Sequence, residues 1–510
     1  MAHRRRFVVP RTTRRTGRPG SQTEWPRPSL RFRERSVFDG VARREVGGVD
    51  LLAHSVAVLV PSLTALGSGL ALPTLVGPGF WISTLLGFGL VGLLVMTFNQ
   101  FASRFKSAGT LYTFVAKGFG PLPALMVGGA LVIGYSAIIG FGLSDASSRF
   151  DAAVDASGFP LDSGAWRVGL LFLACVLMCL YAIGRGIHWT TRAALLAEAV
   201  GLGVLVIVFW AWTARYGLPT WDALSLDGAS PTRILLGAAT IVTLTLAFES
   251  SASLGLETKQ PMRDVPFALR TSLLLAAGLF VLANFVATTR PPDAPSIWSW
   301  RWFAPGADRS IADALVLVVL AWSLVALAMC VWCALARLLF SLAREGVLPG
   351  VLGRVDGRGI PMTAVLAVTP LALAVPTAAI VTGADIDAFS WELKQSAAVV
   401  ICAAYALAAL ALPRFLWSID ELSWAPVAAA LAAGTGATAV AVTQLVTELR
   451  AGTWLALGLL AVSALSGLLM RWWVSTSTTL GDRYIGMHDE AVASAVVLPP
   501  EPPHGVRVDV

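Results

Sequence analysis

The sequence contains little charge for its length. Asp, Glu, Lys and Arg make up 14% of the 510 residues, whereas a soluble domain carries roughly a quarter. Hydrophobic residues make up 56%, and the chain is long enough for about a dozen membrane helices of about 20 residues each. The composition therefore excludes a soluble protein and predicts an all-α polytopic membrane protein. Segments of alternating hydrophobicity are absent, which excludes a membrane β-barrel.

The sequence is also poor in residues that carry chemistry. It has five histidines and five cysteines, too few for the clusters at membrane edges that a membrane enzyme needs. All the cysteines lie in apolar runs, and although Cys330 and Cys333 have a CxxC spacing, a zinc site needs four ligands. We therefore predict packing cysteines, no metal site, no cofactor and no enzyme. A Gly-x-x-x-x-Gly-Lys-Ser/Thr loop is absent, so a nucleotide-driven pump is not expected.

The net charge is +7, and much of it lies in the first 50 residues, before any apolar run. A basic balance can indicate nucleic acid, but this placement indicates a topology signal instead, and we expect no nucleic-acid partner. Residues 1–48, rich in Arg and Pro, predict a disordered cytoplasmic tail, and residues 474–510 predict another. No cleavable signal peptide is visible, since the first long apolar run begins near Val49.

Hydropathy predicts twelve membrane-spanning helices. The predicted spans are about 49–71, 80–103, 121–143, 166–184, 192–213, 233–256, 268–289, 312–342, 362–382, 393–412, 424–446 and 453–473. If the N-terminus is inside, the predicted inner loops carry more Lys and Arg than the outer loops, as cytoplasmic loops should. We therefore predict a multi-pass protein of the plasma (inner) membrane with both termini cytoplasmic.

Two of the predicted spans are interrupted. The first contains Pro61, which removes a backbone donor, and then Gly67 and Gly69, which loosen the helix. The sixth is apolar up to Ala247 and then places an acid and three hydroxyls at membrane depth, in residues 248–253. An ionisable group inside a span indicates a functional site, and irregular backbone there is tolerated only where it lines a protein cavity. A simple proline kink in the first span is the alternative interpretation.

Interruptions in spans 1 and 6 are what two inverted five-helix halves produce, and paired broken spans indicate a transporter's binding site. The ten-helix core then covers 49–413, with repeats at about 49–213 and 233–412, and two additional helices follow over 414–473. At each break, the N-terminal end of a half-helix suits a carboxylate, and free carbonyls suit an ammonium group. A zwitterionic amino acid presents both charges, so we predict an amino acid or a related amine as substrate.

Three stretches give this pattern a family resemblance. They are residues 107–115 (SAGTLYTFV), residues 248–252 with 256–268 (FESSA and LETKQPMRDVPFA), and residues 336–349 (ARLLFSLAREGVLP). In this order they resemble the amino acid–polyamine–organocation superfamily of permeases, in its bacterial amino acid permease branch, over roughly residues 47–415. The resemblance implies the leucine-transporter fold and substrate contact by the unwound parts of spans 1 and 6. Carried over by position, the substrate-binding residues are Ser62, Leu63, Thr64, Ala65, Leu66, Phe248, Glu249, Ser250 and Ser251.

The sequence departs from the family pattern at three places. Residues 62–64 stand where many members have Gly-x-Gly, although residues 67–69 offer a competing alignment. Ala247 stands where the sixth span has glycine. Some proton-coupled members carry a lysine in span 5, and this span, from Thr191 to Trp212, has none. The coupling mechanism of those proton-coupled members therefore cannot be assigned to this sequence from the resemblance alone.

Two acids are candidates for coupling transport to protons. Glu249 can bind the substrate amine, carry a proton, or accept hydrogen bonds that hold the broken backbone. Glu198, about 9 Å into span 5 at helical rise, can relay protons, although a pair with a neighbouring basic group is the favoured interpretation. Tyr135 and Tyr405 can reach the site, but packing is favoured for both.

The sequence thus predicts a secondary active transporter that moves amino acids or related amines across the membrane by alternating access, coupled to protons. A substrate exchanger and a polyamine carrier are the alternatives within this class; a polyamine carrier would need more acids facing the cavity than Glu249 alone. A nutrient sensor with the same fold and no transport is the alternative outside it. The lipid bilayer is the remaining predicted partner.

Overall fold

The computed structural model describes residues 31–32, 45–105, 110–159, 164–289, 311–477, 485–486 and 497–498. Most of the two predicted tails lies outside these described residues. The chain divides into two compact units. In the smaller one, the described residues are two strands, β1 (Arg31–Phe32) and β2 (Val497–Leu498), which pair antiparallel. The larger unit, residues 37–490, holds the helices.

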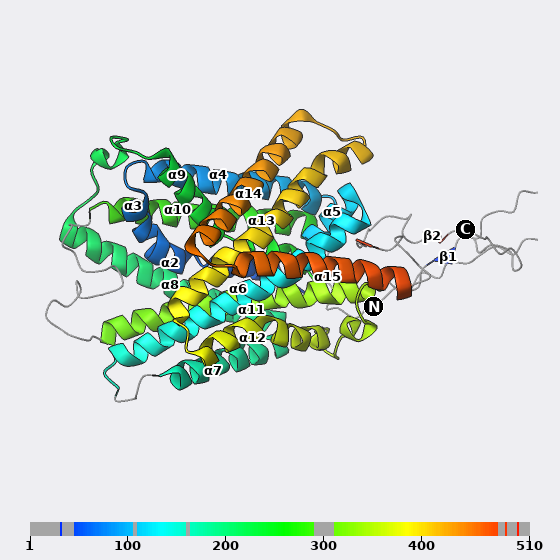
Figure 1. The fold of residues 1–510 in the computed structure, drawn as a ribbon, viewed down its shortest axis with the longest axis horizontal. Coiled ribbons are helices and arrows are strands. Elements are labelled where there is room, and N and C mark those ends of the chain that lie inside the picture. The colour runs from blue at the N-terminus through cyan, green and yellow to red at the C-terminus, as the bar shows by residue number, and fades with distance from the viewer. Residues whose placement is uncertain are drawn as a thin grey trace, which may run out of the picture. The chain divides into compact units, whose positions relative to one another are not determined.

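The described helices of the larger unit form a bundle (Figure 1). The α-helices are α1 (Gly48–Leu59), α2 (Pro61–Thr64), α3 (Leu70–Val76), α4 (Phe80–Ala102), α5 (Leu111–Phe119), α6 (Pro121–Ala156), α7 (Ala165–Gly184), α8 (Ile187–Tyr216), α9 (Pro231–Leu244), α10 (Pro261–Ala287), α11 (Ile311–Arg344), α12 (Met362–Thr382), α13 (Ile386–Ser418), α14 (Trp424–Ala451) and α15 (Leu455–Ser477). Between them lie a π-helix, η1 (Ala65–Gly69), and the 3-10 helices η2 (Trp221–Leu224), η3 (Phe248–Leu256) and η5 (Gly350–Gly353).

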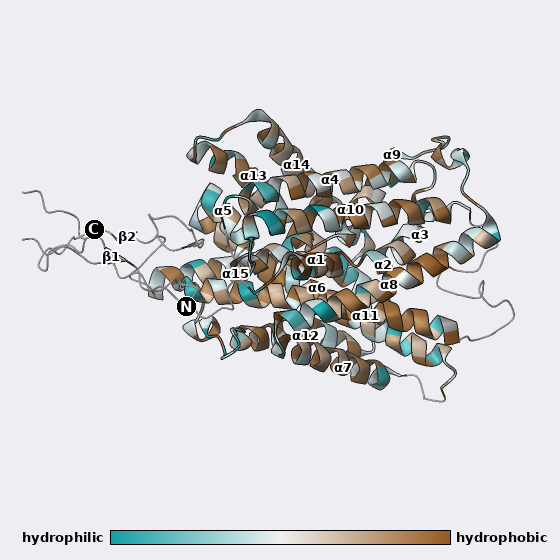
Figure 2. Cartoon of the chain, turned by 180° about the vertical axis from the view of Figure 1, so that it is seen from behind, coloured by the Kyte–Doolittle hydropathy of each residue, from teal (hydrophilic) through white to brown (hydrophobic). Residues whose placement is uncertain are grey.

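Within the described part of the chain, 12 helical stretches are long and apolar enough to cross a membrane, and each overlaps one predicted span. The all-α class and the count of spans are thereby confirmed. Apolar residues predominate along these helices (Figure 2), as they must where helices face lipid and one another. Several predicted spans are too short; two differences matter for the site, because α6 extends to Ala156 and α13 begins at Ile386. The second difference brings Asp387 and Ser390 into the helix.

Helix α6 lies at the centre of the bundle. In its most apolar window 89% of the residues are buried, compared with 22% in the window of α15. It packs along α11 and α13, and α6 and α11 lie side by side in Figure 1. Helix α14 packs on α13 and α4, and α15 packs on α6 and α13. The last two helices therefore cover the core from the side.

The first span is interrupted where the sequence predicts. Helix α1 ends at Leu59, Val60 is left-handed (φ 44°), and Pro61 begins the short helix α2. A left-handed backbone costs a residue with a side chain about 1–2 kcal/mol, and it persists only where the surrounding structure holds it. The chain continues through the π-helix η1, a form that is frequent at functional sites, before α3 resumes regular α-helix.

The sixth span is interrupted earlier than predicted. Helix α9 ends at Leu244, and Ala247 is left-handed (φ 65°) just before η3 begins. The prediction that the apolar helix continues to Ala247 is therefore wrong. The reason lies in a distant residue, because the Ala247 N–H donates to Tyr405 Oη (2.9 Å) and not to a carbonyl one turn back. Helix η3 then carries the acid and the hydroxyls that the sequence singles out.

Candidate functional site

The two interrupted spans contact each other directly. His54 Nε2 on α1 lies 3.3 Å from Ser250 Oγ on η3. One residue further along each element, the Ser55 hydroxyl donates to Ser251 Oγ at 2.8 Å. These side chains are all buried. The half-helix before the first break, α1, therefore contacts the segment after the second break, η3, through buried polar side chains.

Glu249 joins three parts of the bundle. Its Oε1 accepts a hydrogen bond from Tyr135 Oη on α6 at 2.6 Å, and its Oε2 accepts one from Tyr405 Oη on α13. Tyr405 Oη also accepts the Ala247 N–H, so one hydroxyl holds both the acid and the bend before it. The interpretation that both tyrosines only pack is wrong, because each hydroxyl binds the carboxylate.

Glu198 on α8 belongs to a second buried polar group. Its Oε2 accepts a hydrogen bond from Ser62 Oγ at 3.0 Å, and Ser62 Oγ lies 3.3 Å from Ser323 Oγ on α11. Glu198 Oε1 is buried and has no hydrogen-bond partner among the described residues. The favoured pair with a basic group is wrong, since the contacts of Glu198 in this part of the chain are to hydroxyls. Spans 1, 5 and 8 meet at this carboxyl.

Gly201 on α8 is required by the close approach of α2. A Cβ at this position would lie 2.6 Å from Ser62 Oγ and 3.3 Å from Ser323 Oγ. We expect Gly201→Ala to lower the free energy of unfolding by about 1–3 kcal/mol, because α2 must move away from α8. Thermal unfolding of the purified protein in detergent measures this. Gly203→Ala is the matched control, since nothing lies within 4 Å of that Cβ, and equal losses in the two variants would contradict the expectation.

A cavity of about 550 Å³ reaches the break in span 1. It lies at the end of the bundle where α13 begins, which we call the α13 end; the opposite end, where α1 begins, is the α1 end. One face of α6, one face of α13 and the segment after the span-1 break supply most of the lining. The lining residues are Leu63, Thr64, Gly67, Phe141, Asp145, Ser148, Arg149, Ala152, Leu244, Leu317, Asp387, Ser390, Trp391 and Lys394.

The cavity contains two of the nine predicted substrate-binding residues, Leu63 and Thr64. The other seven are buried and do not line it: Ser62, Ala65, Leu66, Phe248, Glu249, Ser250 and Ser251. Their side chains make the polar and aromatic contacts that hold the breaks; the Phe248 ring, for example, stacks on Phe98 with centroids 5.8 Å apart. The structure therefore separates a cavity lining from a buried layer that shapes the two breaks.

Charged residues of the cavity were missed by the sequence reasoning. Asp145 and Arg149 form an ion pair at 3.1 Å, and the Ser148 hydroxyl donates to Asp387 Oδ1 at 2.5 Å. Lys394 lies over the Phe141 ring, with Nζ 4.4 Å from the centroid. A sequence signal for α13 did exist: Asp385 is an N-cap residue, and counting from it places residues 387, 390, 391 and 394 on one helical face.

The α1 end of the bundle is held together by side-chain and backbone contacts, next to a smaller cavity of about 300 Å³ that Arg337 and Glu257 line. Arg337 on α11 donates from Nε and Nη2 to the two carboxylate oxygens of Glu257, at 2.6 and 2.9 Å. Val46 donates its N–H to the Glu257 carbonyl (3.1 Å), and its own carbonyl accepts the Lys259 N–H (3.0 Å). Val46 is fully buried, so this part of the stretch predicted as a disordered tail is ordered. Thr191 on α8 also donates to Asp50 of α1 at 3.1 Å.

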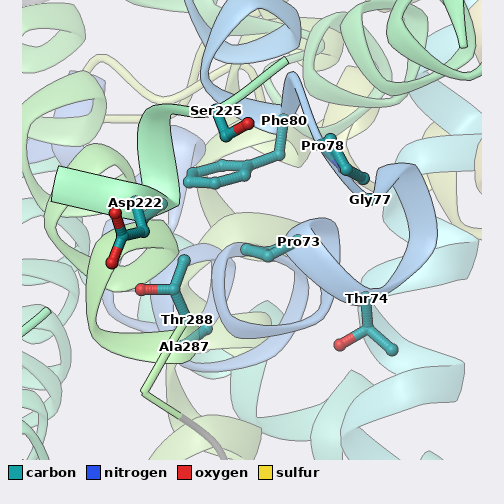
Figure 3. A pocket seen from close by; sticks show the side chains of 10 residues that line it. Pro73, Thr74, Gly77, Pro78, Phe80, Asp222, Ser225, Ala287 and Thr288 are labelled. Carbon is teal, nitrogen blue, oxygen red and sulfur yellow. The ribbon is translucent and has the colours of Figure 1, made fainter. Parts of the chain in front are cut away.

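Figure 3 shows another hollow, of about 510 Å³. Its walls come from α3, the start of α4, η2 and the end of α10, and they include Thr74, Asp222 and Thr288. It contains none of the residues at the two breaks and none of the acids Glu198 and Glu249. The arrangement therefore favours the cavity at the α13 end as the functional site. No group of His, Cys, Asp and Glu in the described residues could hold a metal ion.

Twelve spans in the described residues, with interruptions in the first and the sixth beside a cavity, define an integral membrane protein with the leucine-transporter fold. Comparison with known families agrees, since the model described as amino acid permease matches residues 51–443. The chain belongs to this amino acid permease family.

Individual relatives are distant. The vacuolar cationic amino acid transporter 2 of Arabidopsis thaliana is 25% identical over 379 residues, which are 64% of this chain and 56% of that protein. A branched-chain amino acid permease of Lactococcus lactis is 23% identical, over 64% of this chain and 74% of the permease. A methylthioribose transporter of Bacillus subtilis is 21% identical, over 61% and 70% respectively. The chain spans about half the length of the plant transporters it matches (56% and 53%).

A solved structure supports the fold independently. It is that of Mhp1, a nucleobase-cation-symport-1 family transporter in a closed conformation with bromovinylhydantoin bound. The likeness has a TM-score of 0.50 at 16% sequence identity and covers 86% of this chain and 97% of the other. At this identity the likeness concerns the fold alone.

Proposed function

We propose that this protein is a secondary active transporter that moves amino acids or related amines by alternating access. The observation that carries the proposal is the cavity of about 550 Å³, which reaches the broken first span from the α13 end, while the Arg337–Glu257 pair and the backbone contacts of Val46 hold the α1 end together. A carrier that opens to one side at a time needs such a site between two ends. Membership of the amino acid permease family favours amino acids as the substrate class.

The proposed orientation places both termini in the cytoplasm of a cell bounded by its plasma (inner) membrane. The excess of Lys and Arg in the loops at the α1 end supports it. In this orientation the cavity opens to the outside, and the Arg337–Glu257 pair closes the cytoplasmic side. Breaking that pair and forming an equivalent closure around Asp387 and Ser148 would expose the site to the cytoplasm. Ten helices then form the two inverted repeats, and α14 and α15 are additional.

We propose protons as the coupling ion and Glu198 as their carrier, with Glu249 as a second candidate. A carboxylate is costly inside a membrane unless it is paired, and the described contacts of Glu198 are to hydroxyls rather than cations. A carboxyl in this position can gain and lose a proton as the helices around it separate. Because Ser62 belongs to the broken first span and Ser323 to span 8, movement between them changes the surroundings of Glu198 directly.

Uptake by the purified protein in proteoliposomes tests the function. The experiment uses a panel of labelled amino acids and amines, with and without an inward proton gradient. We expect one amino acid class to accumulate, and the gradient to stimulate accumulation. Uptake that required substrate preloaded inside would identify an exchanger. Binding without uptake, by protein shown to be folded, would contradict transport and favour a sensor.

Glu198→Gln tests the coupling role. We expect gradient-driven accumulation by the variant to fall at least about tenfold, while exchange of labelled for unlabelled substrate is retained. The reason is that glutamine keeps the Ser62 contact but cannot gain and lose a proton. Glu421→Gln is the control, since Glu421 is an exposed acid paired with Arg104. Gradient-driven uptake by Glu198→Gln at the level of the control would exclude Glu198 as the carrier.

A further inference from the structure

Lys394 is a buried cation with few protein contacts. It lies in α13, its residue is 5% exposed, and it lines the cavity. In the described residues its one close polar or aromatic contact is the Phe141 ring, 4.4 Å from Nζ. A lysine ammonium has three donors. A cation–ring contact offsets only part of what burying an ammonium costs, so Lys394 has hydrogen-bonding capacity directed at the cavity.

The other charges of the cavity are already engaged with one another. Asp145 pairs with Arg149 at 3.1 Å. Asp387 lies seven residues before Lys394, about 10 Å along the helix axis, and accepts the Ser148 hydroxyl. Neither carboxylate forms an ion pair with Lys394 among the described contacts. Asp145 attracts the Lys394 ammonium and Arg149 repels it, but no carboxylate oxygen of the described residues binds its N–H groups, so these donors are available to a ligand in the cavity.

The position of Lys394 argues for ligand recognition rather than a structural role. A lysine that stabilises a fold is expected to bind a carboxylate or a helix end, or to extend its ammonium to water. Lys394 instead lies among the cavity-facing residues of α13, on the same face as Ser390 and Trp391. Leu63, Thr64 and Gly67 from the broken first span line the same cavity. A small molecule in the cavity can therefore contact the first span and Lys394 together.

We infer that Lys394 binds the carboxylate of the transported substrate. The inference rests on the proposed transport function and narrows its substrate class to carboxylate-bearing amino acids. Polyamines carry no carboxylate for Lys394 to bind and fall outside this class. It also assigns carboxylate recognition to the tenth span, where the sequence alone predicts that half-helix ends hold both charges of the substrate.

Competition against uptake of a labelled amino acid in proteoliposomes tests the inference. The competitors are the unlabelled amino acid, its carboxamide, and the amine left by decarboxylation. For the wild-type protein we expect the amide and the amine to compete at least about tenfold more weakly than the acid, as expected for loss of a charge-assisted hydrogen bond. For Lys394→Met we expect uptake affinity to fall at least about tenfold and the preference for the acid to disappear. Lys394→Arg should keep the preference.

Arg450→Met is the matched control, because it removes an exposed cation from the same end of the bundle without changing the cavity lining. If the amide or the amine competes with the wild-type protein as well as the acid does, the inference is wrong, although the proposed transport function still holds. This comparison uses the wild-type protein, so it decides the question even if Lys394→Met misfolds. A folded Lys394→Met that keeps its preference for the acid overturns it as well. If the wild-type protein neither binds nor transports any amino acid, the proposed function fails and the inference fails with it.

Discussion

Replacing Arg337 by alanine is expected to lower the free energy of unfolding by about 3–5 kcal/mol, because the substitution leaves the Glu257 carboxylate buried without its partner. The pair is bidentate, with N–O distances of 2.6 and 2.9 Å. Arg337 and Glu257 are only 9% and 4% exposed. The Arg337 side chain also donates to the Cys333 carbonyl at 3.0 Å. Unfolding the purified protein in detergent with heat or with a denaturant measures this loss of stability.

Two further variants test whether the loss comes from an unpaired buried charge. The double variant Glu257→Gln with Arg337→Met removes both charges, and it should recover part of the stability that Arg337→Ala loses. Arg104→Ala breaks an ion pair to Glu421 whose side chains are 27% and 55% exposed, and such pairs contribute about 0–1 kcal/mol. An Arg337→Ala variant no less stable than Arg104→Ala would show that the buried pair does not hold the α1 end closed.

The features that the sequence predicts well are those set by neighbouring residues. Twelve apolar runs predict twelve spans because a helix in lipid satisfies its own backbone and needs only a continuous apolar stretch. Pro61 predicts the first break for the same local reason, since it lacks the N–H that a continuing helix requires. Both features follow from short segments considered one at a time.

The features that escape prediction depend on residues far apart in the chain. Tyr135 and Tyr405 lie 114 and 156 residues from Glu249, and nothing in either apolar helix indicates that its hydroxyl meets that acid. The break before Ala247 begins early because Tyr405 takes its N–H, which is again a distant contact. Tertiary contacts thus decide where the sixth span stops being helical.

Helical geometry explains why the expected partner of Glu198 is wrong. Arg192 is the nearest basic residue before it, but six residues are about one and two-thirds turns of a helix, so the two side chains point to different faces. Arg192 is exposed and Glu198 is buried. The start of α13 is a similar case: a span boundary placed seven residues late leaves Asp387 and Ser390, which line the cavity, outside the predicted helix. Small errors in helix ends therefore have large consequences for the predicted site.

Replacing Glu249 by alanine is expected to lower both stability and transport strongly. The change leaves the buried hydroxyls of Tyr135 and Tyr405 without their acceptor, at about 1–3 kcal/mol for each unsatisfied group. It also releases Tyr405, whose hydroxyl binds Glu249 and accepts the Ala247 N–H, and this second contact helps to fix Ala247 in its left-handed conformation. We expect uptake in proteoliposomes to fall more than tenfold, since the two breaks would no longer keep one arrangement next to the cavity.

Tyrosine variants separate the structural part of this effect from a direct role of the acid. Tyr135→Phe removes one donor and leaves Tyr405 bound to both Glu249 and Ala247, so it should lose about 0.5–1.5 kcal/mol of stability and keep most of its uptake. Tyr405→Phe also removes the contact to the Ala247 N–H, so it should lose more stability and more uptake than Tyr135→Phe. The Tyr135 and Glu249 substitutions touch one network, so their effects on stability should not add. Additive losses, or normal uptake by Glu249→Ala, would mean that the carboxylate does not organise the broken spans.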